Sequence, residues 1–265
     1  MDNLFQIRAG TIPLLVSIPH TGTDVPEPIF ERLTAQAKKL PDTDWDLDRL
    51  YDLPVLRDCS LIQAKLSRYV IDLNRPASNA SLYPGQNTTE ICPVTTFSGE
   101  PIYQPGNEPD ESEIASRIST YWQPYHSAIA DELDRLKAFH GQVVLFDAHS
   151  IASEVPRLFP GRLSDFNFGT NQGRSCSASF QSMVNQFSAD QLPEYSSIVN
   201  GRFIGGYITR NYGRPVENVD ALQLELSQAT YMNETSGELN NEAAAIVQNS
   251  LSLFLERILN WIQSK

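Results

Sequence analysis

Two apolar runs in the sequence each lead directly into polar residues. Residues 143–151 begin with VVLF and continue into DAHS, which contains Asp147 and His149. Residues 11–19 are similarly apolar, and His20 follows them. Runs of this kind predict strands that are buried on both faces of a parallel sheet. Because open α/β sheets bind ligands at the carboxyl ends of their strands, both polar ends are candidate sites.

Helical periodicity predicts longer elements around these strands. Apolar residues recur every three or four positions over residues 111–140, and a shorter helix is predicted over 177–189. Pro124 should kink the long helix, and Gly141 should end it. A capping-box sequence at 235–238 is predicted to open a closing amphipathic helix.

The rest of the chain predicts shorter elements and one long loop. The pattern predicts a helix over 26–40 and strands over 60–66, 69–73, 204–212 and 221–226. Residues 77–109 are rich in turn-forming residues, and a loop of this length is usually functional or flexible. The alternation of strands and helices predicts an α/β fold: three α/β/α layers around a mixed, largely parallel sheet. No repeat or linker divides the sequence, so we expect a single domain over residues 1–265.

Composition and charge narrow the possible partners. The net charge of −12 argues against nucleic acid, because phosphate binding needs a basic face, although a few local arginines could still bind a small anion. No apolar run is long enough to span a membrane, and residues 1–10 lack the apolar core of a signal peptide. The three cysteines form no metal-spaced pair and no disulfide framework, which favours a reducing, cytoplasmic location. No protein partner is implied.

The histidines suggest a metal site. His20 and His149 each follow a predicted strand, and Asp147 could support His149 as a second-shell carboxylate. Two histidines, one carboxylate and a water form a common catalytic zinc set. The other two histidines, His126 and His140, lie on the long predicted helix, where a structural role is expected. Spacing alone does not choose the carboxylate ligand among Asp24, Asp42, Asp44, Asp46 and Asp147.

Other charged residues stand in or beside predicted strands. Glu225 lies within the apolar sequence ALQLEL, where a carboxylate is costly to bury unless it is paired or functional. It could form an ion pair with an arginine or act as a general base. Arg68 and the Asn74-Arg75 pair flank another strand end. They could form surface salt bridges, or they could bind a substrate carboxylate, for which a planar guanidinium is well suited.

Taken together, these residues resemble the N-formylglutamate amidohydrolases, also called N-formylglutamate deformylases. The resemblance extends from about Ile12 to Met232. Its motifs, in chain order, are IPHTG, DTDW, SRYVIDLNRP, SLYPGQ, DAHSI, VPRLFPGR, NGRFIGGYITRNYG and LQLELSQATYM. It implies hydrolysis of N-formyl-L-glutamate to formate and L-glutamate, the last step of a histidine degradation route, with one bound divalent metal ion, usually Zn²⁺. The implied fold is similar to that of zinc carboxypeptidases and aspartoacylase-type deacylases, the phosphorylase/hydrolase-like fold.

The resemblance also implies a metal-ligand set. The carboxypeptidase-like relatives use a His-x-x-Glu pair as their first two ligands, but Thr23 stands where that glutamate would be. By match to the Thr-Asp-Trp element of the family, Asp44 is the expected carboxylate ligand, with Asp46 as the second choice. The implied set is therefore His20, Asp44 and His149.

Further roles follow from the same resemblance. Glu225 occupies the place of the catalytic glutamate, and Arg68 resembles an arginine that polarises the substrate carbonyl. Asn74 and Arg75 resemble a pair that holds a substrate carboxylate. Arg210, and after it Arg157, are candidates for the second carboxylate of a dicarboxylic substrate.

Three other functions remain as alternatives. A zinc deacylase of another N-acyl amino acid or a carboxypeptidase would use the same residues, since the long loop at 77–109 could reshape the pocket. A noncatalytic anion-binding protein would have structural histidines and no stoichiometric metal. A serine hydrolase is disfavoured, because Ser150 lacks the flanking glycines of a nucleophile elbow.

Overall fold

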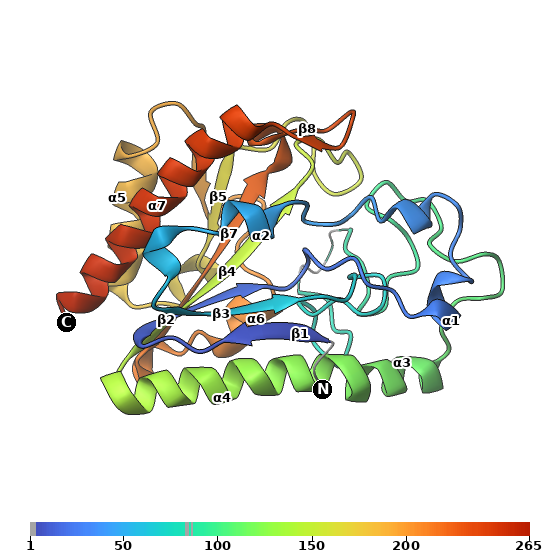
Figure 1. Ribbon diagram of the computed structural model, residues 1–265, viewed down its shortest axis with the longest axis horizontal. Coiled ribbons are helices and arrows are strands. Elements are labelled where there is room, and N and C mark those ends of the chain that lie inside the picture. The colour runs from blue at the N-terminus through green and yellow to red at the C-terminus, as the bar shows by residue number, and fades with distance from the viewer. Residues whose placement is uncertain (1–3, 83–84, 86) are drawn as a thin grey trace.

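A seven-stranded mixed sheet forms the centre of the molecule (Figure 1). The computed structural model describes residues 4–82, 85 and 87–265. The strand order is β1-β3-β2-β4-β7-β5-β6, in which only the β1–β3 and β5–β7 neighbours are antiparallel among the described residues. The strands are β1 (Phe5–Arg8), β2 (Ile12–Ile18), β3 (Cys59–Ala64), β4 (Val143–Ile151), β5 (Phe166–Gly169), β6 (Ser197–Val199) and β7 (Val219–Ser227). A separate hairpin pairs β8 (Met232–Asn233) with β9 (Glu238–Leu239).

Helices cover both faces of this sheet, which confirms the predicted three-layer α/β/α architecture (Figure 1). One face packs against α2 (Leu47–Leu50), α5 (Ala178–Asp190) and α7 (Asn241–Gln263). The other packs against α4 (Gln123–His140) and α6 (Tyr207–Tyr212). Two further helices, α1 (Glu27–Phe30) and α3 (Glu111–Arg117), lie toward one end of the molecule. None of the described helices combines the length and hydrophobicity that crossing a lipid bilayer requires.

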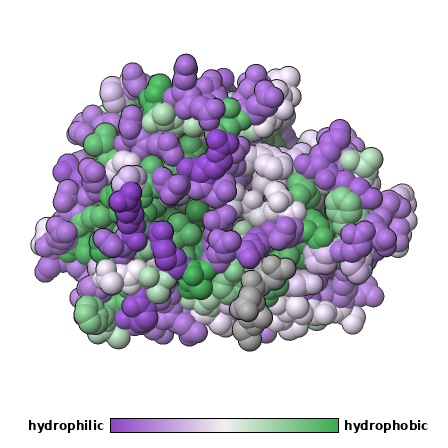
Figure 2. Space-filling view, in the orientation of Figure 1, coloured by the Kyte–Doolittle hydropathy of each residue, from purple (hydrophilic) through white to green (hydrophobic). Residues whose placement is uncertain are grey.

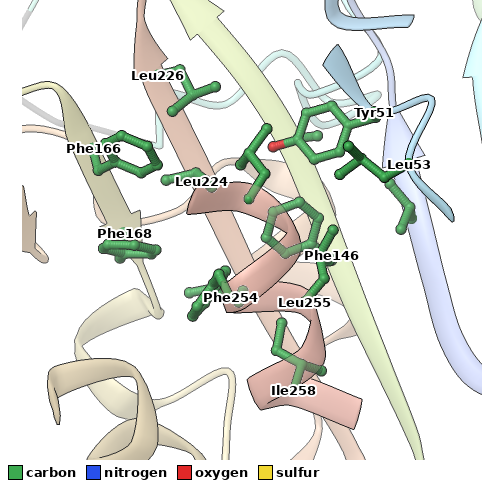
Figure 3. Packing of buried hydrophobic residues seen from close by; sticks show 14 of the residues in the cluster. Tyr51, Leu53, Phe146, Phe166, Phe168, Leu224, Leu226, Phe254, Leu255 and Ile258 are labelled. Carbon is green, nitrogen blue, oxygen red and sulfur yellow. The ribbon is translucent and has the colours of Figure 1, made fainter. Parts of the chain in front are cut away.

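The alternation of side chains along β4 explains why two helical layers are needed. Its nine residues are all buried. Val144 and Phe146 point to one face and Val143 and Leu145 to the other, as the two-residue period of a strand requires. On the first face, Phe254 of α7 packs among the aromatic rings of β4 and β5 (Figure 3). Outside this core, the face in Figure 2 is mainly hydrophilic, with scattered hydrophobic residues.

The long helix predicted over residues 111–140 is continuous, but its hydrogen-bond pattern changes along its length. It divides into α3, a π-helical turn at Ile118–Trp122, and α4. Pro124 lies just after the π-helical turn, and Trp122 and Gln123 before it keep helical backbone angles. Gly141 ends α4 in the left-handed conformation, with φ 77°, as predicted.

Several shorter elements were predicted incorrectly. Residues 69–73 form turns, and only α1 and a 3₁₀ turn at Ala37–Lys39 occupy the helix predicted over 26–40. The capping box at 235–238 does not begin the last helix, because Asn240 caps α7 by accepting a hydrogen bond from the Ala243 N–H. Short apolar runs do not distinguish a strand from buried turns, which explains the first error.

The strand predicted over residues 204–212 is also wrong. Gly205 has φ 119°, a conformation outside a regular strand, and α6 begins two residues later. The chain therefore enters a helix where the apolar pattern suggested a strand. In the SLYPGQ motif, Tyr83, Pro84 and Gln86 lie outside the described residues.

Candidate metal centre and active site

Neighbouring parallel strands bring the two predicted strand-end histidines together. His149 lies near the end of β4, and His20 follows the end of the adjacent β2. The loop before α2 carries Asp44, whose backbone N–H donates to the His20 carbonyl at 3.1 Å. One ligand atom from each of His20, Asp44 and His149 lies within 4.8 Å of the others, and all three side chains are buried. This group could therefore bind a metal ion.

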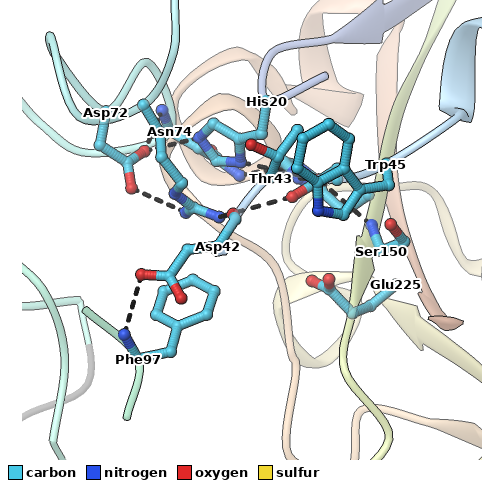
Figure 4. A network of polar contacts seen from close by, with 12 residues as sticks. His20, Asp42, Thr43, Trp45, Asp72, Asn74, Phe97, Ser150 and Glu225 are labelled. Carbon is cyan, nitrogen blue, oxygen red and sulfur yellow. Dashed lines mark hydrogen bonds and ion pairs between the residues drawn. The ribbon is translucent and has the colours of Figure 1, made fainter. Parts of the chain in front are cut away.

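Each imidazole is oriented by its own carboxylate. Nε2 of His20 lies 2.7 Å from Oδ1 of Asp72 (Figure 4). Nε2 of His149 lies 2.9 Å from Oδ2 of Asp147. The Nδ1 atoms of both rings face Oδ2 of Asp44, at 3.8 Å and 3.1 Å. A carboxylate at one ring nitrogen fixes the tautomer and leaves the other nitrogen to bind a metal. The donor set and its support therefore fit a divalent ion.

Contacts around Asp44 distinguish it from the alternative carboxylate ligand. Its Oδ2 accepts a hydrogen bond from the Ser150 N–H at 3.2 Å, and its Oδ1 lies 3.4 Å from Arg68 Nη1. Burial alone would raise the pKa of Asp44, but the hydrogen bond from His149 and the nearby positive charges lower it below its ordinary value. Asp46 instead pairs with Arg49 at the surface, at 3.2 Å. The structure thus brings Asp44, and not Asp46, to the histidines.

The electrostatic surroundings of His149 also favour a cation. Burial alone would lower the pKa of His149, but the charge of Asp147, its hydrogen bond and that of Asp44 raise this pKa well above its usual value. Burial, followed by the charge of Arg68, lowers the pKa of His20. The two rings therefore differ, and the surroundings of His149 stabilise positive charge.

The helical histidines lie away from this group. His126 is held by Tyr212 Oη at Nδ1 and by the Leu73 carbonyl at Nε2, each at 2.9 Å. Burial lowers its pKa to about 4. His140 contacts the Thr11 carbonyl at 2.8 Å. The contacts of both histidines are structural, which agrees with the role expected for His126 and His140.

Arg68 contacts the carboxylates more extensively than the sequence indicated. Its Nη1 donates to the Asp42 carbonyl at 3.2 Å and also lies close to Asp44, while its Nη2 donates to Asp72 Oδ2 at 2.9 Å. Its guanidinium lies over the Phe97 ring, 4.6 Å from the centroid. These contacts hold Asp44 and Asp72 in place beside the histidines. The predicted role of Arg68 in polarising the substrate carbonyl stays a prediction.

A cavity opens beside the two histidines, and Glu225, on β7, forms part of its lining together with His20 and His149. The backbone of Glu225 lies opposite His149 in the β4–β7 register. Figure 4 shows Asp72 and Asn74 on one side of the group and Glu225 on the other. Burial raises the pKa of Glu225 to about 8, against the opposing effect of His149. A carboxyl group with a pKa near neutrality can both accept and donate a proton under ordinary conditions.

The predicted substrate-binding residues are only partly brought together. Asn74 and Arg75 line the cavity, together with Arg202. Arg157 and Arg210 are absent from its described lining: Arg157 donates to Thr96 and Thr95, and Arg210 donates to the carbonyls of Gly205 and Leu82. Of these four arginines, Arg75 and Arg202 are the two that belong to the described lining of the cavity.

Some residues in the cavity wall or behind it had no role predicted from the sequence. Asp72 and Arg202 stood inside the quoted DLNR and NGRF motifs, so their motifs were the available signal. Gln223 lies in the quoted LQLELSQATYM motif, and its Nε2 donates to Glu225 Oε2 at 3.0 Å. Phe97 lies in the long loop, where no periodicity marked it.

The sequence matches one family model over most of its length. This is the model of the N-formylglutamate amidohydrolases, matched over residues 12–232. A Pseudomonas aeruginosa protein named N-formylglutamate deformylase is 43% identical over 266 residues, which cover 98% of each chain. A Pseudomonas putida protein of the same name is 41% identical, over 98% of this chain and 97% of its own.

Solved structures show the same fold. The crystal structure of an N-formylglutamate amidohydrolase from Ralstonia eutropha is similar with a TM-score of 0.82 at 24% identity, over 98% of both chains. A gene product of Agrobacterium tumefaciens gives 0.72 at 18% identity, over 98% of this chain and 96% of its own. At these identities the structural likeness supports the architecture alone.

We expect His149→Ala to abolish stoichiometric zinc binding, because the substitution removes one of the three converging ligand atoms. The fold should survive, since a core of this size does not depend on a metal. His140→Ala, at the end of α4, is the matched control and should retain zinc. Metal analysis after dialysis, with circular dichroism as the check on folding, makes the measurement. Retention of one zinc ion at wild-type affinity by His149→Ala would show that the ligand set is misassigned.

Proposed function

The chain belongs to the N-formylglutamate amidohydrolase family, and we propose that it hydrolyses N-formyl-L-glutamate to formate and L-glutamate at the buried His20–Asp44–His149 group. The observation that supports this location most strongly is the pair of carboxylate-braced imidazoles whose Nδ1 atoms face Asp44. Glu225 and three arginines, Arg68, Arg75 and Arg202, belong to the described lining of the cavity beside this group.

We propose zinc as the metal, since two histidines and one carboxylate are a common catalytic zinc set. When bound, a divalent ion would act as a Lewis acid and lower the pKa of a water molecule to about 7. His20, Asp44 and His149 would hold it. Asp72, Asp147 and Arg68 would keep those side chains oriented.

Glu225 is proposed as the general base and acid. It takes a proton from the attacking water as the water oxygen bonds to the formyl carbon, and it returns that proton to the amide nitrogen as the C–N bond breaks. The products are formate and the free amino group of glutamate. The position of Glu225 on the cavity wall, opposite His149 in the β4–β7 register, supports this role.

Arg75 and Arg202 are proposed to bind the two carboxylates of the substrate. Arg75 is held by the Thr89 carbonyl at 3.0 Å, and Arg202 by the Leu158 carbonyl at 2.9 Å. Each guanidinium is therefore positioned by the protein through Nε, and each residue lines the cavity. Guanidinium groups form paired hydrogen bonds with carboxylates, which fixes orientation as well as affinity. This assignment replaces Arg210 by Arg202 as the second anchor.

Glu225→Gln should keep the fold and the bound metal but lower kcat by about 10²- to 10⁴-fold, because the amide preserves shape and cannot transfer the proton. Glu132→Gln is the matched control: Glu132 is also buried, but it contacts Ser60 and Arg135 outside the cavity. Formate release from N-formyl-L-glutamate, measured with zinc content, makes the comparison. Activity of Glu225→Gln within a few-fold of wild type would leave Glu225 with a structural role.

Arg75→Ala and Arg202→Ala should each lower kcat/KM for N-formyl-L-glutamate by at least about tenfold, because each leaves a substrate carboxylate unpaired in the cavity. N-formyl-L-glutamine and N-formyl-L-leucine, which lack the second carboxylate, should be poor substrates of the wild type. Arg214→Ala, at the surface beside Glu217, is the control. Equal kcat/KM for the three compounds on wild type would contradict dicarboxylate specificity. A loss with Arg210→Ala and none with Arg202→Ala would restore Arg210 as the anchor.

A further inference from the structure

The first turn of α6 directs its backbone N–H groups at two amide side chains of the cavity wall. The Gly206 N–H donates to Gln223 Oε1 at 2.6 Å, and the Ile208 N–H donates to Asn74 Oδ1 at 2.8 Å. Between them, the Tyr207 N–H donates to the Asn74 carbonyl at 3.2 Å. These groups would otherwise be the unpaired donors of a helix start.

These hydrogen bonds determine which end of each amide faces the site. An amide side chain has an acceptor oxygen and a donor nitrogen, so a fixed N–H at one end excludes the flipped orientation. The nitrogen of Gln223 consequently faces Glu225, at 3.0 Å from its Oε2. The nitrogen of Asn74 faces the His149–Asp147 pair, at 2.9 Å from His149 Nε2 and 3.2 Å from Asp147 Oδ2, and Asp147 is the carboxylate that orients His149.

We propose that the first turn of α6 is a positioning element for the active site. It sets the orientation of Asn74 and Gln223, and these two residues in turn hold Asp147 and Glu225. Asn74 and Gln223 are positioning residues in this scheme, because they act through other groups. The tests of this proposal that measure kcat rest on the proposed function, and the spectroscopic test does not.

Gly206 lies so close to the Asn74 side chain that it leaves no room for a side chain of its own. Its backbone has φ −84° and ψ −164°, an extended conformation that any residue can adopt. A Cβ atom at this position would nevertheless lie 2.3 Å from Asn74 Nδ2 and 2.6 Å from Asn74 Oδ1. The absence of a side chain is therefore required by the close approach of Asn74 and not by the backbone conformation.

The segment that carries Asn74 cannot easily move away from α6. On its other side, Trp122 Nε1 donates to the Arg75 carbonyl at 2.9 Å. His126 Nε2 lies 2.9 Å from the Leu73 carbonyl, and the Asn74 N–H donates to Asp72 Oδ1 at 2.9 Å. The two carbonyls that flank Asn74 are thus held from the π-helical turn and α4. A methyl group on residue 206 must then displace the Asn74 amide or the start of α6.

The decisive variant is Gly206→Ala, compared with wild type and with Asn211→Gly. Asn211 is an exposed residue of α6, and its replacement by glycine weakens the helix without contact to Asn74. We expect Gly206→Ala to lower kcat by about tenfold or more, with a smaller change in KM and with zinc retained, because small displacements of positioned groups are costly in rate. Asn211→Gly should keep wild-type kcat.

A double-mutant cycle tests whether the effect passes through Asn74. In the Asn74→Ala background the added methyl group has no amide to displace, so Gly206→Ala should change kcat by less than about twofold. Wild-type kcat in Gly206→Ala, or an equal loss in both backgrounds, would overturn the proposal. If Gly206→Ala does not fold, Gln223→Glu takes its place. It keeps the acceptor for the Gly206 N–H but removes the donor to Glu225, and the same tenfold loss is expected; full kcat would overturn the proposal.

A spectroscopic readout separates this inference from the proposed function. The side-chain amide resonances of Asn74 and Gln223 can be identified in ¹⁵N-labelled protein by their loss in Asn74→Ala and Gln223→Met. They should shift in Gly206→Ala and remain unchanged in Asn211→Gly, whether or not the substrate is correct. Unshifted amide resonances in Gly206→Ala would contradict the positioning role. A wild type that releases no formate would instead contradict the proposed function.

Discussion

Burying a carboxylate is costly unless each oxygen gains a donor or a cation, and this site buries Asp44, Asp72 and Asp147 together. Arg68 contacts the first two, and the imidazoles of His20 and His149 contact all three. The same surroundings raise the pKa of His149, so the protein interior is arranged here to hold positive charge.

The strand order of the sheet brings the residues of this site together. Parallel pairing of β2, β4 and β7 places His20, His149 and Glu225 at one end of the sheet. The segments that complete the site are irregular, and each is held by contacts from an ordered neighbour. Asp44 receives the Ser150 N–H from β4, and the Leu73 and Arg75 carbonyls are held from α4 and the turn before it. Rigid elements thus position side chains that the loops carry.

The sequence predicted the sheet-borne part of this site far better than the loop-borne part. His20 and His149 could be found because apolar strands end beside them, and parallel strands bring such ends together. Asp44 lies in an acidic loop with other candidates, so only the resemblance to a known family selected it. Asp72 and Arg202 received no role, because their partners are distant in sequence and no periodicity marks a loop contact. The segments at 69–73 and 204–212 were read as strands because apolar residues in turns and in a short buried helix give the same pattern.

In the proposed mechanism, formate release depends on a metal held by His20, Asp44 and His149. The most direct measurement is formate release from N-formyl-L-glutamate by the purified protein, before chelation, after chelation and dialysis, and after stoichiometric zinc is restored. We expect activity in the first state, its loss in the second while the protein stays folded, and its recovery in the third. Undiminished formate release from folded protein shown to contain no metal would contradict it.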